Sequence, residues 1–389
     1  MPFLNVVDPA FSFTAPEVFA AQEASWYADT PIGAVVLRHA EAHELLRDRR
    51  LDHGGDGYLR TNGITSGPIY DWWVPMIVNH DGADHRRLRG LVHKSFTPRT
   101  VDQLRPFIRA KTTELAGALD GADFVESFSD RLPLAVMCEL LGVPPEDYDV
   151  FSQWTGDIGM IFGLAAGGDT AARVERAVAG LTGYVDALID RRVAHPSGDL
   201  ISGMIAAWRT DDTVTRDEVR NLLVTLVFGA HDNTRDQFSN ALVAFAEHPD
   251  QWAVLRGHPE LAERAVNEAM RWRPSASTVL RRSIEDFEYG GLPLPAGSLL
   301  TVAVQIAQRD PRAYPGGDVF DITVVREAPL LQFGAGPHYC LGSALAHAEL
   351  EEALPILASR LGSPAIAGPV TWRPAIGIHG PNKLPLTFG

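Results

Sequence analysis

The ten residues 333–342 read Phe333-Gly334-Ala335-Gly336-Pro337-His338-Tyr339-Cys340-Leu341-Gly342. This glycine-rich loop ends close to one cysteine and leads into the apolar, alanine-rich run 341–357, whose spacing has a helical period. Unpaired backbone N–H groups and the positive end of the helix dipole converge where a helix starts, so a cysteine placed there favours the thiolate over the thiol. A metal-ligating thiolate is therefore one interpretation of Cys340.

Two plainer interpretations fit the same residues. An isolated cysteine is usually a small buried hydrophobe, and a glycine-rich turn before a helix is often only a turn. The Gly-x-Gly spacing also mimics a phosphate-binding loop, but no buried strand precedes it at the spacing that a dinucleotide-binding fold requires. The loop alone leaves the metal-ligand and packing interpretations open.

The loop resembles the heme-binding loop of the cytochrome P450 family, whose pattern is Phe-x-x-Gly-x-x-x-Cys-x-Gly. Every fixed position of this pattern is present. The resemblance implies that Cys340 is the thiolate ligand of the iron in heme b (iron protoporphyrin IX) and that His338 donates to a heme propionate. It implies further heme contacts from Phe333, Gly334, Gly342 and Ala346. The implied fold is mainly α, with a large helical lobe, a smaller β-rich lobe, and the heme between the long central helix and the helix after Cys340.

Composition limits the partners that the chain can have. Its 389 residues are 46% hydrophobic and 21% charged, which is typical of a soluble globular protein. The net charge of −15 argues against a nucleic-acid partner, because a phosphate backbone would be repelled. We find no leader-like N-terminal segment and no run near the roughly 20 apolar residues of a membrane span. We therefore expect a cytoplasmic protein without a membrane partner.

The two cysteines, Cys138 and Cys340, are too few for a cysteine-rich zinc site or a disulfide framework. Cys138 lies in the apolar run 132–141 and is expected in the core. The chain has no internal repeat, no low-complexity linker and no break in composition. Residues 1–389 are therefore predicted to form a single domain.

A second motif lies at residues 81–89, which read Asp-Gly-Ala-Asp-His-Arg-Arg-Leu-Arg. His85 and Arg89 are four residues apart, so they share one helix face that suits the binding of an anion. The segment resembles the family's Asp-Pro-Pro-Glu-His-x-x-x-Arg stretch, with Gly82 and Ala83 in place of the prolines. The match implies that His85 and Arg89 contact a heme propionate.

More basic residues accompany this motif on an acidic chain: Arg86, Arg87, Lys94 and Arg99. A run of charge is usually only a solvated face. The resemblance places this helix on the cysteine side of the heme, where positive charge would steer an acidic redox protein. It implies electron delivery by a ferredoxin or flavodoxin-type donor with an NAD(P)H reductase, since no flavin or nicotinamide module is fused.

A long helix is predicted over 216–248, and residues 228–235 at its centre read Phe-Gly-Ala-His-Asp-Asn-Thr-Arg. A glycine in mid-helix costs about 1 kcal/mol relative to alanine, so close approach of something flat could explain it. The centre resembles the family's oxygen-activating signature, Ala/Gly-Gly-x-Asp/Glu-Thr-Thr. The match implies a heme contact at Ala230 and catalytic roles for Asp232, Asn233 and Thr234.

Asn233 departs from this signature, whose fifth position is usually threonine. The threonine hydroxyl helps to deliver protons for O–O cleavage, whereas an amide is not readily ionised or exchanged. Three explanations stay open. The amide holds a water that delivers the proton, the substrate supplies the hydroxyl, or the reaction is an oxidative coupling without oxygen insertion.

Further residues gain roles from the resemblance. Glu268 and Arg271 match the Glu-x-x-Arg motif and are interpreted as structural, although an exposed pair with this spacing is common. Arg281 is expected at a heme propionate, with Arg282 as the alternative one register step away. The segment 51–80 reads as a loop that caps the substrate pocket, and packing of that loop is the alternative role for one of its two tryptophans. The expected substrate contacts are Trp72, Trp73, Met76, Val279 and Ile378.

Four motifs thus occur in the family's order along nearly the whole chain. They imply a heme-thiolate monooxygenase that uses O2 and two externally supplied electrons to hydroxylate an apolar or aromatic small molecule, in specialised metabolite biosynthesis. One alternative is an atypical member that couples or cyclises its substrate without oxygen insertion. Another is a non-catalytic heme-thiolate sensor or carrier. A peroxide-driven oxygenase is disfavoured by Asp232, because that variety has an arginine-based site in place of the acid.

Overall fold

The computed structural model describes residues 1–93, 96–119, 122–161 and 169–389. The chain divides into two compact units. Unit 1 comprises residues 1–53, 109–129 and 233–389, and unit 2 comprises residues 54–108 and 130–232. One boundary falls inside the 32-residue helix α11 (Arg216–Glu247) and another inside α6 (Pro98–Ala116). The single-domain organisation stays a prediction.

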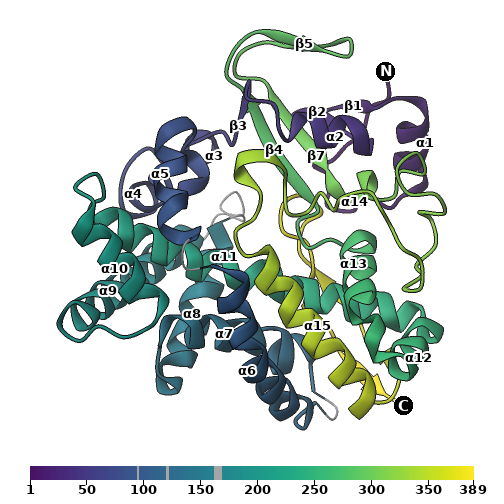
Figure 1. Ribbon diagram of the computed structural model, residues 1–389. Coiled ribbons are helices and arrows are strands. Elements are labelled where there is room, and N and C mark those ends of the chain that lie inside the picture. The colour runs from purple at the N-terminus through teal and green to yellow at the C-terminus, as the bar shows by residue number, and fades with distance from the viewer. Residues whose placement is uncertain (94–95, 120–121, 162–168) are drawn as a thin grey trace. The chain divides into compact units, whose positions relative to one another are not determined.

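Unit 1 contains a mixed five-stranded sheet with the strand order β1-β2-β7-β4-β3. The strands are β1 (Tyr27–Thr30), β2 (Gly33–Val36), β7 (Leu299–Ala303), β4 (Thr278–Ser283) and β3 (Leu51–Asp52). Figure 1 shows the purple β2 beside the green β7, which is far from it in sequence. These two strands run parallel, and the other pairs are antiparallel. Val36 and Val302 pair in register and are fully buried, so their apolar side chains fix the sheet within the core.

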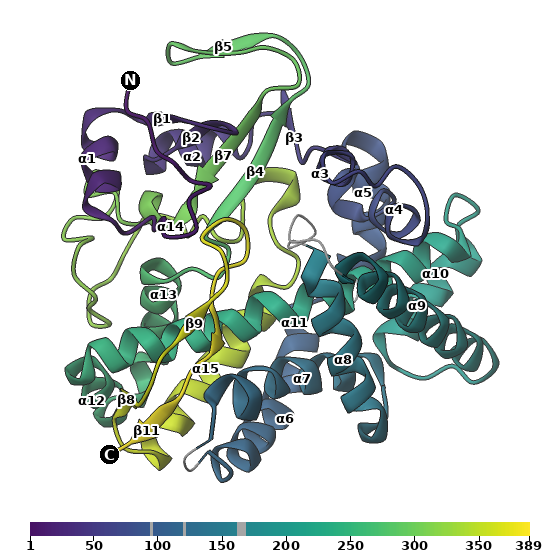
Figure 2. The same cartoon turned by 180° about the vertical axis from the view of Figure 1, so that it is seen from behind.

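The other elements of unit 1 are short strands and helices. Its remaining helices are α1 (Pro16–Ala24), α2 (His39–Leu45), α12 (Pro249–Gly257), α13 (Ala262–Trp272), α14 (Val304–Ala307) and α15 (Ser343–Arg360). Its remaining strands form the antiparallel pairs β5 (Phe287–Tyr289) with β6 (Leu292–Leu294), β8 (Pro364–Ile366) with β11 (Leu386–Phe388), and β9 (Thr371–Trp372) with β10 (Pro381–Lys383). Figure 2 shows β8 and β11 beside α12 at the C-terminal end of the chain.

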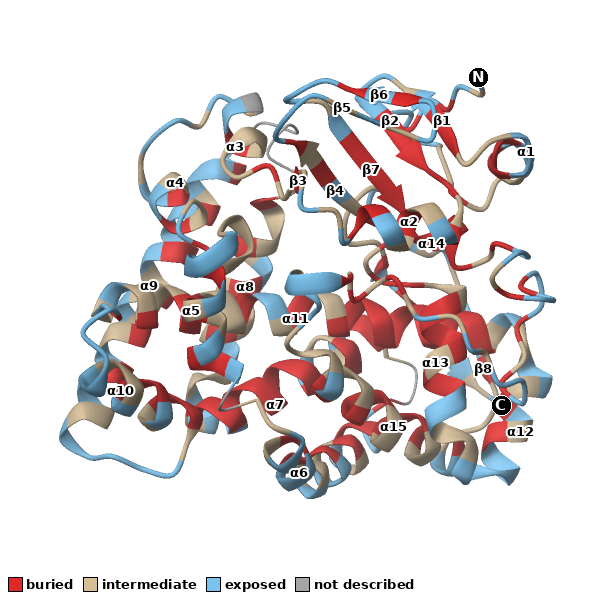
Figure 3. Ribbon diagram, turned by 45° about the horizontal axis from the view of Figure 1, so that its top comes forward, coloured by how far each residue is buried: buried red, intermediate tan, exposed pale blue. Residues whose placement is uncertain are grey.

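A buried ion pair joins α13 to the irregular chain that follows α14. Arg271 is 1% exposed and donates to both carboxylate oxygens of Glu268, each at 2.7 Å. Arg271 also donates to the carbonyl oxygens of Gln308, Gly317 and Val319, at 3.1, 2.8 and 3.0 Å. Burial raises the pKa of Glu268, but hydrogen bonds from Arg271 and its charge outweigh this effect, so that the pKa is lowered. The pair is charged, and its hydrogen bonds tie α13 to residues 308–319. Figure 3 shows buried residues along α13 and α15.

Unit 2 is helical over its described residues. Besides parts of α6 and α11, its helices are α3 (Gly57–Thr61), α4 (Pro68–Trp73), α5 (Gly82–His93), α7 (Arg131–Leu141), α8 (Tyr148–Gly159), α9 (Thr170–Ala194) and α10 (Leu200–Thr210). The expectation of a loop over 51–80 was partly wrong, because α3 and α4 lie in it. Pro68 at the first turn of α4 has a fixed φ that suits a helix start.

Cys138 in α7 is fully buried, as expected, and burial raises the pKa of its thiol to about 12. Helices α8 and α9 pack against each other through aromatic side chains. The rings of Phe151 and Tyr184 meet edge to face, with their centroids 4.9 Å apart. No described helix is long and apolar enough to cross a membrane.

The charge state of Glu349 gives a test of the packing of α15. Glu349 is 2% exposed, its Oε2 has no hydrogen-bond partner among the described residues, and burial raises the pKa of the carboxyl well above its ordinary 4.5. The folded chain therefore binds this proton more tightly than the unfolded chain does. Above the unfolded pKa, the free energy of unfolding of the wild type should fall with pH by up to about 1.4 kcal/mol per unit from this group.

Glu349→Gln keeps the shape of the side chain and removes this titration. Urea denaturation from pH 5 to 8 should show the variant gaining stability relative to the wild type as pH rises. Glu327→Gln, at an exposed site, is the matched control and should follow the wild type. A stability difference for Glu349→Gln that does not change with pH would contradict the assignment.

Candidate active site

The Cys340 loop is closed by backbone hydrogen bonds within unit 1. The N–H of Cys340 donates to the carbonyl oxygen of Phe333 at 2.8 Å, and that of Tyr339 donates to Gly336 at 3.1 Å around a short 3-10 turn. Gly334 and Gly336 have φ values of 70° and 69°, in the left-handed region that favours glycine. The loop thus leaves Cys340 exposed three residues before α15 begins, and the cysteine forms no disulfide.

The other residues predicted as heme contacts lie on either side of Cys340 in the sequence. Phe333 is 9% exposed, and its ring lies 5.1 Å from that of His347. His338 is half-buried, with its ring 4.3 Å from that of His53. The N–H of Ala346 donates to the carbonyl oxygen of Gly342 at 2.9 Å, which forms the first hydrogen bond of the helix. Phe333 and His338 therefore have defined packing beside the exposed thiol.

Strand β4 separates the two candidate arginines. Arg282 donates to both carboxylate oxygens of Asp52 on β3, at 3.2 and 2.7 Å. Arg281 precedes it in the strand, so its side chain points to the opposite face, and it is 3% exposed. Arg282 is therefore engaged in pairing the strands, which favours Arg281 as the anion-binding residue.

The segments that carry two of the expected substrate contacts, Val279 and Ile378, are joined at the start of β4. Ala276, just before β4, forms a bridge with Ile378, and the N–H of Gly377 donates to the hydroxyl of Thr278 at 2.7 Å. Val279, next to Thr278, is half-buried. The loop that carries Ile378 is thus held by hydrogen bonds close to the start of the strand that carries Val279.

In unit 2, α5 carries the predicted anion-binding pair. His85 is 3% exposed, and Arg89 follows it by four residues and is half-buried. Arg87 on the same helix donates to both carboxylate oxygens of Glu218, at 3.1 and 2.7 Å, so it ties α5 to α11. Arg86 is exposed and makes no ion pair with a described residue.

The other two basic residues of this cluster are Lys94 and Arg99. Arg99 is exposed, whereas Lys94 lies outside the described residues. Among the described residues of the cluster, Arg87 is bound to Glu218, so their exposed positive charge comes from Arg86 and Arg99. The number of charges that are open to a partner is therefore smaller than the sequence suggested.

The small residues at the centre of α11 are not covered by other described residues. Gly229 is exposed, and a Cβ built on it would meet nothing within 4 Å among the described residues; Ala230 is half-exposed. The side chains of Asn233 and Thr234, one turn later, make no hydrogen bond to a described residue. This stretch could therefore accept a flat group against its backbone.

Asp232 is buried beside a histidine and against a glycine. His231 Nδ1 lies 3.5 Å from Asp232 Oδ1, and His231 Nε2 lies 3.1 Å from the carbonyl oxygen of Asp130. The first distance is too long for a good hydrogen bond, so the attraction to Asp232 is mainly one of charge. Burial lowers the pKa of His231, but the carboxylates of Asp232 and Asp130 outweigh it and leave the pKa raised.

Sequence reasoning missed His231 and Gly159 as partners of Asp232. A Cβ on Gly159, at the end of α8, would lie 2.4 Å from Asp232 Oδ2. For His231, the sequence did contain a signal, because a histidine stands next to an acid in an apolar helix. Nothing in the sequence connects residue 159 to residue 232, because their contact exists only in the folded unit.

The two tryptophans of the 51–80 segment, Trp72 and Trp73, lie in different surroundings. Trp73 Nε1 donates to the carbonyl oxygen of Gly55 at 3.0 Å, which holds the segment down. Trp72 is 5% exposed, packs edge-on against Phe228 at 5.6 Å, and its Nε1 has no hydrogen-bond partner among the described residues. Met76 is also 5% exposed. Both tryptophans therefore pack within unit 2, and Trp73 in addition holds the segment through its hydrogen bond to Gly55.

Comparison with known proteins identifies the family. The family model for Cytochrome P450 matches residues 256–360. Luteothin monooxygenase of Streptomyces thioluteus is 43% identical over 392 residues, which cover 100% of this chain and 96% of the relative. The chain therefore belongs to the cytochrome P450 family, and it is a monooxygenase of that family. Bacterial members act on small molecules and receive electrons from a redox partner.

Solved structures agree with this assignment. CalO2 has a TM-score of 0.88 and 29% identity, with 98% of this chain and 99% of CalO2 covered. The P450 enzyme CxnD, for C–S bond formation in chuangxinmycin biosynthesis, has a TM-score of 0.84 and 28% identity, with 96% and 94% covered. The predicted fold class, a mainly α cytochrome P450 fold with a small β-rich part, is confirmed.

The residues present fit the heme that this family carries. In unit 1, an exposed thiol stands at a helix start, and Arg281 and His338 carry cationic or potentially cationic side chains. In unit 2, His85 and Arg89 do so on α5, and a Cβ built on Gly229 would meet nothing described within 4 Å. The described residues contain no cluster of three or more His, Cys, Asp or Glu side chains that could hold another metal.

The contact between Gly159 and Asp232 can be tested by a double-mutant cycle. Gly159→Ala should destabilise the protein by about 1–3 kcal/mol, because the new methyl group overlaps the carboxylate. The cost should largely disappear when Asp232 is replaced by alanine, and thermal denaturation of the four proteins measures it. Gly156→Ala on the same helix is the control, since nothing described lies within 4 Å of its Cβ. Equal costs in both backgrounds would contradict the contact.

Proposed function

We propose that this protein is a heme-thiolate monooxygenase that hydroxylates an apolar or aromatic small molecule in specialised metabolite biosynthesis. The observation that carries the proposal is the exposed Cys340, held at the start of α15 by a loop whose hydrogen bonds and left-handed glycines fix it. Substrate, O2, two electrons and two protons give hydroxylated product and water. The electron donor is proposed to be a ferredoxin or flavodoxin-type protein with an NAD(P)H reductase, and the location cytoplasmic.

The chain's residues take distinct roles in this proposal. When bound, heme b supplies the activation of O2. Cys340 ligates the iron as a thiolate, and Arg281, His338, His85 and Arg89 neutralise the two propionates. The carboxylate of Asp232 holds and passes a proton, with His231 beside it to stabilise the charge.

The remaining site residues shape the pocket. Ala230 lets the cofactor approach α11, and Phe333, Gly334, Gly342 and Ala346 support it at the cysteine loop. Trp72, Met76, Val279 and Ile378 exclude water and contact the substrate. Trp73 acts through its bond to Gly55, which positions the segment that carries Trp72.

A second candidate function is oxidative coupling or ring formation without oxygen insertion. Asn233 favours it, because this side chain has no hydrogen-bond partner among the described residues and lacks the hydroxyl of the usual threonine. CxnD, a structural neighbour, is an enzyme for C–S bond formation. The two candidates differ in whether an oxygen atom from O2 enters the product.

The spectrum of the reduced protein with carbon monoxide tests the primary proposal. The wild type loaded with heme should show the strongly red-shifted Soret band of a thiolate ligand. Cys340→Ser should lose that band, while Cys138→Ala should keep it because Cys138 is buried in α7. A wild type without the band, or a Cys340→Ser variant that retains it, would overturn the assignment.

The same assay tests the electron donor when a reduced ferredoxin replaces the chemical reductant. Arg86→Glu should slow the appearance of the band several-fold at low salt and less at high salt, because salt screens exposed charges. Arg209→Glu, at another exposed arginine, is the charge-matched control. Equal rates for both variants would remove Arg86 from the docking surface.

Asn233→Thr tests the second candidate during turnover with an accepted substrate. We expect either a new oxygenated product or a change of about tenfold, roughly 1.4 kcal/mol, in product formed per NAD(P)H consumed. Mass spectrometry with 18O2 identifies inserted oxygen. Unchanged product and unchanged coupling would show that Asn233 has no special role. Uptake of 18O by the wild-type product would exclude coupling without insertion.

A further inference from the structure

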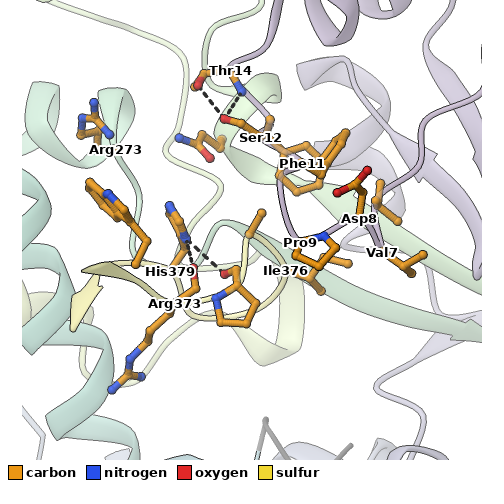
Figure 4. A pocket seen from close by; sticks show the side chains of 16 residues that line it. Val7, Asp8, Pro9, Phe11, Ser12, Thr14, Arg273, Arg373, Ile376 and His379 are labelled. Atoms are coloured by element: carbon orange, nitrogen blue, oxygen red, sulfur yellow. Dashed lines mark hydrogen bonds between the residues drawn. The ribbon is translucent and has the colours of Figure 1, made fainter. Parts of the chain in front are cut away.

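A cavity of about 810 Å³ lies within unit 1, and none of the residues assigned to the heme or the substrate lines it. Figure 4 shows its walls, which come from the N-terminal segment 6–14, the loop 372–379, and single residues after α13 and in α14. Its volume is within the range of about 300–1,000 Å³ typical of sites that bind small molecules. The cavity is therefore large enough for a ligand of its own.

One part of the cavity wall is apolar and aromatic. Pro9, Phe11 and Ile376 contribute to it, and Figure 4 shows Phe11 and Ile376 among the side chains that line the space. Phe11 makes an edge-to-face contact at 4.9 Å with the buried Phe13, which also lines the cavity. This wall suits a ring or an alkyl chain.

A second part of the wall is a stack of planar groups. Trp372 stacks on the ring of His379 with centroids 5.2 Å apart and an angle of 15° between the planes, and the Arg273 guanidinium lies 5.7 Å from the Trp372 centroid. His379 Nδ1 lies 3.1 Å from the carbonyl oxygens of both Arg373 and Pro374, so it must be the donor (Figure 4). Burial lowers the pKa of His379, which keeps the ring neutral.

The polar group that points to a ligand is Gln305. It is 5% exposed and lines the cavity, but its side-chain amide makes no hydrogen bond to any described residue. Its backbone N–H donates to Ser277 at 3.2 Å, so the residue's position is fixed. Its amide oxygen and nitrogen are not among the fully buried unpartnered atoms, so both keep some accessible surface. Because Gln305 lines the cavity, these atoms can hydrogen-bond to a molecule bound there.

Arg273 adds a positive charge with unused donors. Its Nη2 donates to Glu247 at 2.6 Å, its Nε is buried without a partner, and its Nη1 makes no hydrogen bond with a described residue. The other charges of the lining are less available. Arg373 Nε lies 3.4 Å from the buried Asp236, and Asp8 Oδ1 accepts from the N–H of Ala10. Gln305 and the Nη1 of Arg273 thus each offer hydrogen-bond donors that no described residue uses.

We propose that this cavity is a second ligand site that binds a small organic acid with an aromatic or apolar body. The carboxylate accepts hydrogen bonds from the Gln305 amide and the Arg273 guanidinium, and the body of the molecule lies against Phe11, Ile376 and Trp372. Carboxylates accept stronger hydrogen bonds from arginine than neutral groups do, and this sets the preference for an acid. The proposal does not depend on Cys340 or on the reaction at the heme.

Calorimetric titration of the heme-loaded protein with 3-phenylpropionate tests the proposal. Saturating imidazole is added as an iron ligand, so that binding near the heme is blocked. We expect one molecule of the acid to bind per chain, at least tenfold more tightly than 3-phenylpropionamide, which has the same body without the charge. No heat of binding up to about 10 mM, equal affinity for acid and amide, or loss of binding when imidazole is present would overturn the proposal.

Two variants locate the site. Gln305→Leu should weaken binding of the acid by about tenfold, while Gln103→Leu, at an exposed glutamine on α6, should leave it unchanged. Val7 lines the cavity and is 52% exposed, so Val7→Glu places a negative charge at the rim without burying it. Val7→Glu should weaken binding of the acid about tenfold relative to Val7→Gln and leave binding of the amide unchanged. The comparison of Val7→Glu with Val7→Gln tests the location even if Gln305→Leu fails to fold. Unchanged binding of the acid to Val7→Glu would refute the location.

Discussion

The position of the cysteine loop depends on the buried pair of Glu268 and Arg271. Arginine keeps its charge in proteins, so a guanidinium that is 1% exposed requires a buried anion, and loss of one partner of such a pair costs about 3–5 kcal/mol. The remaining donors of Arg271 hold three carbonyl oxygens between residues 308 and 319. Gln308 in turn accepts the N–H of Leu331, two residues before Phe333. The irregular chain that leads to Cys340 is thus fixed by hydrogen bonds rather than by a regular element.

Local motifs are the part of the candidate site that a sequence can specify most directly. Phe333 to Gly342, Glu268 with Arg271, and His85 with Arg89 each specify a backbone geometry within ten residues, and helix or turn spacing is enough to interpret them. The mainly α fold with a small β-rich part followed from the resemblance. The choice between Arg281 and Arg282 needed the strand register, because a shift of one residue moves a side chain to the other face of a sheet.

Contacts between distant segments were the part that sequence could not predict. Gly159 has no sequence signal that connects it to Asp232, and Gln305 looks like an ordinary polar residue in the stretch 299–307, which is otherwise largely apolar. The cavity that contains Gln305 has walls from four separate parts of the chain, so its existence depends on tertiary packing. The two short helices in 51–80 were missed for a related reason, since five glycines in that segment favour a loop, but Pro68 and the packing of Trp72 and Trp73 favour α4.

The loop 372–379 links the cavity to the helix that carries Asn233. Asn240 of α11 donates to the carbonyl oxygen of His379 at 2.8 Å, and Asp236 of the same helix lies 3.4 Å from Arg373. Gly380 follows the loop at close range to this helix, where a Cβ would lie 2.6 Å from Asp236. Since Ile378 is in the same loop, a displacement of the cavity wall must either break these contacts or be shared by α11. The polar, buried second half of α11 therefore does more than fill the core, because it fixes the loop that both candidate ligand sites use.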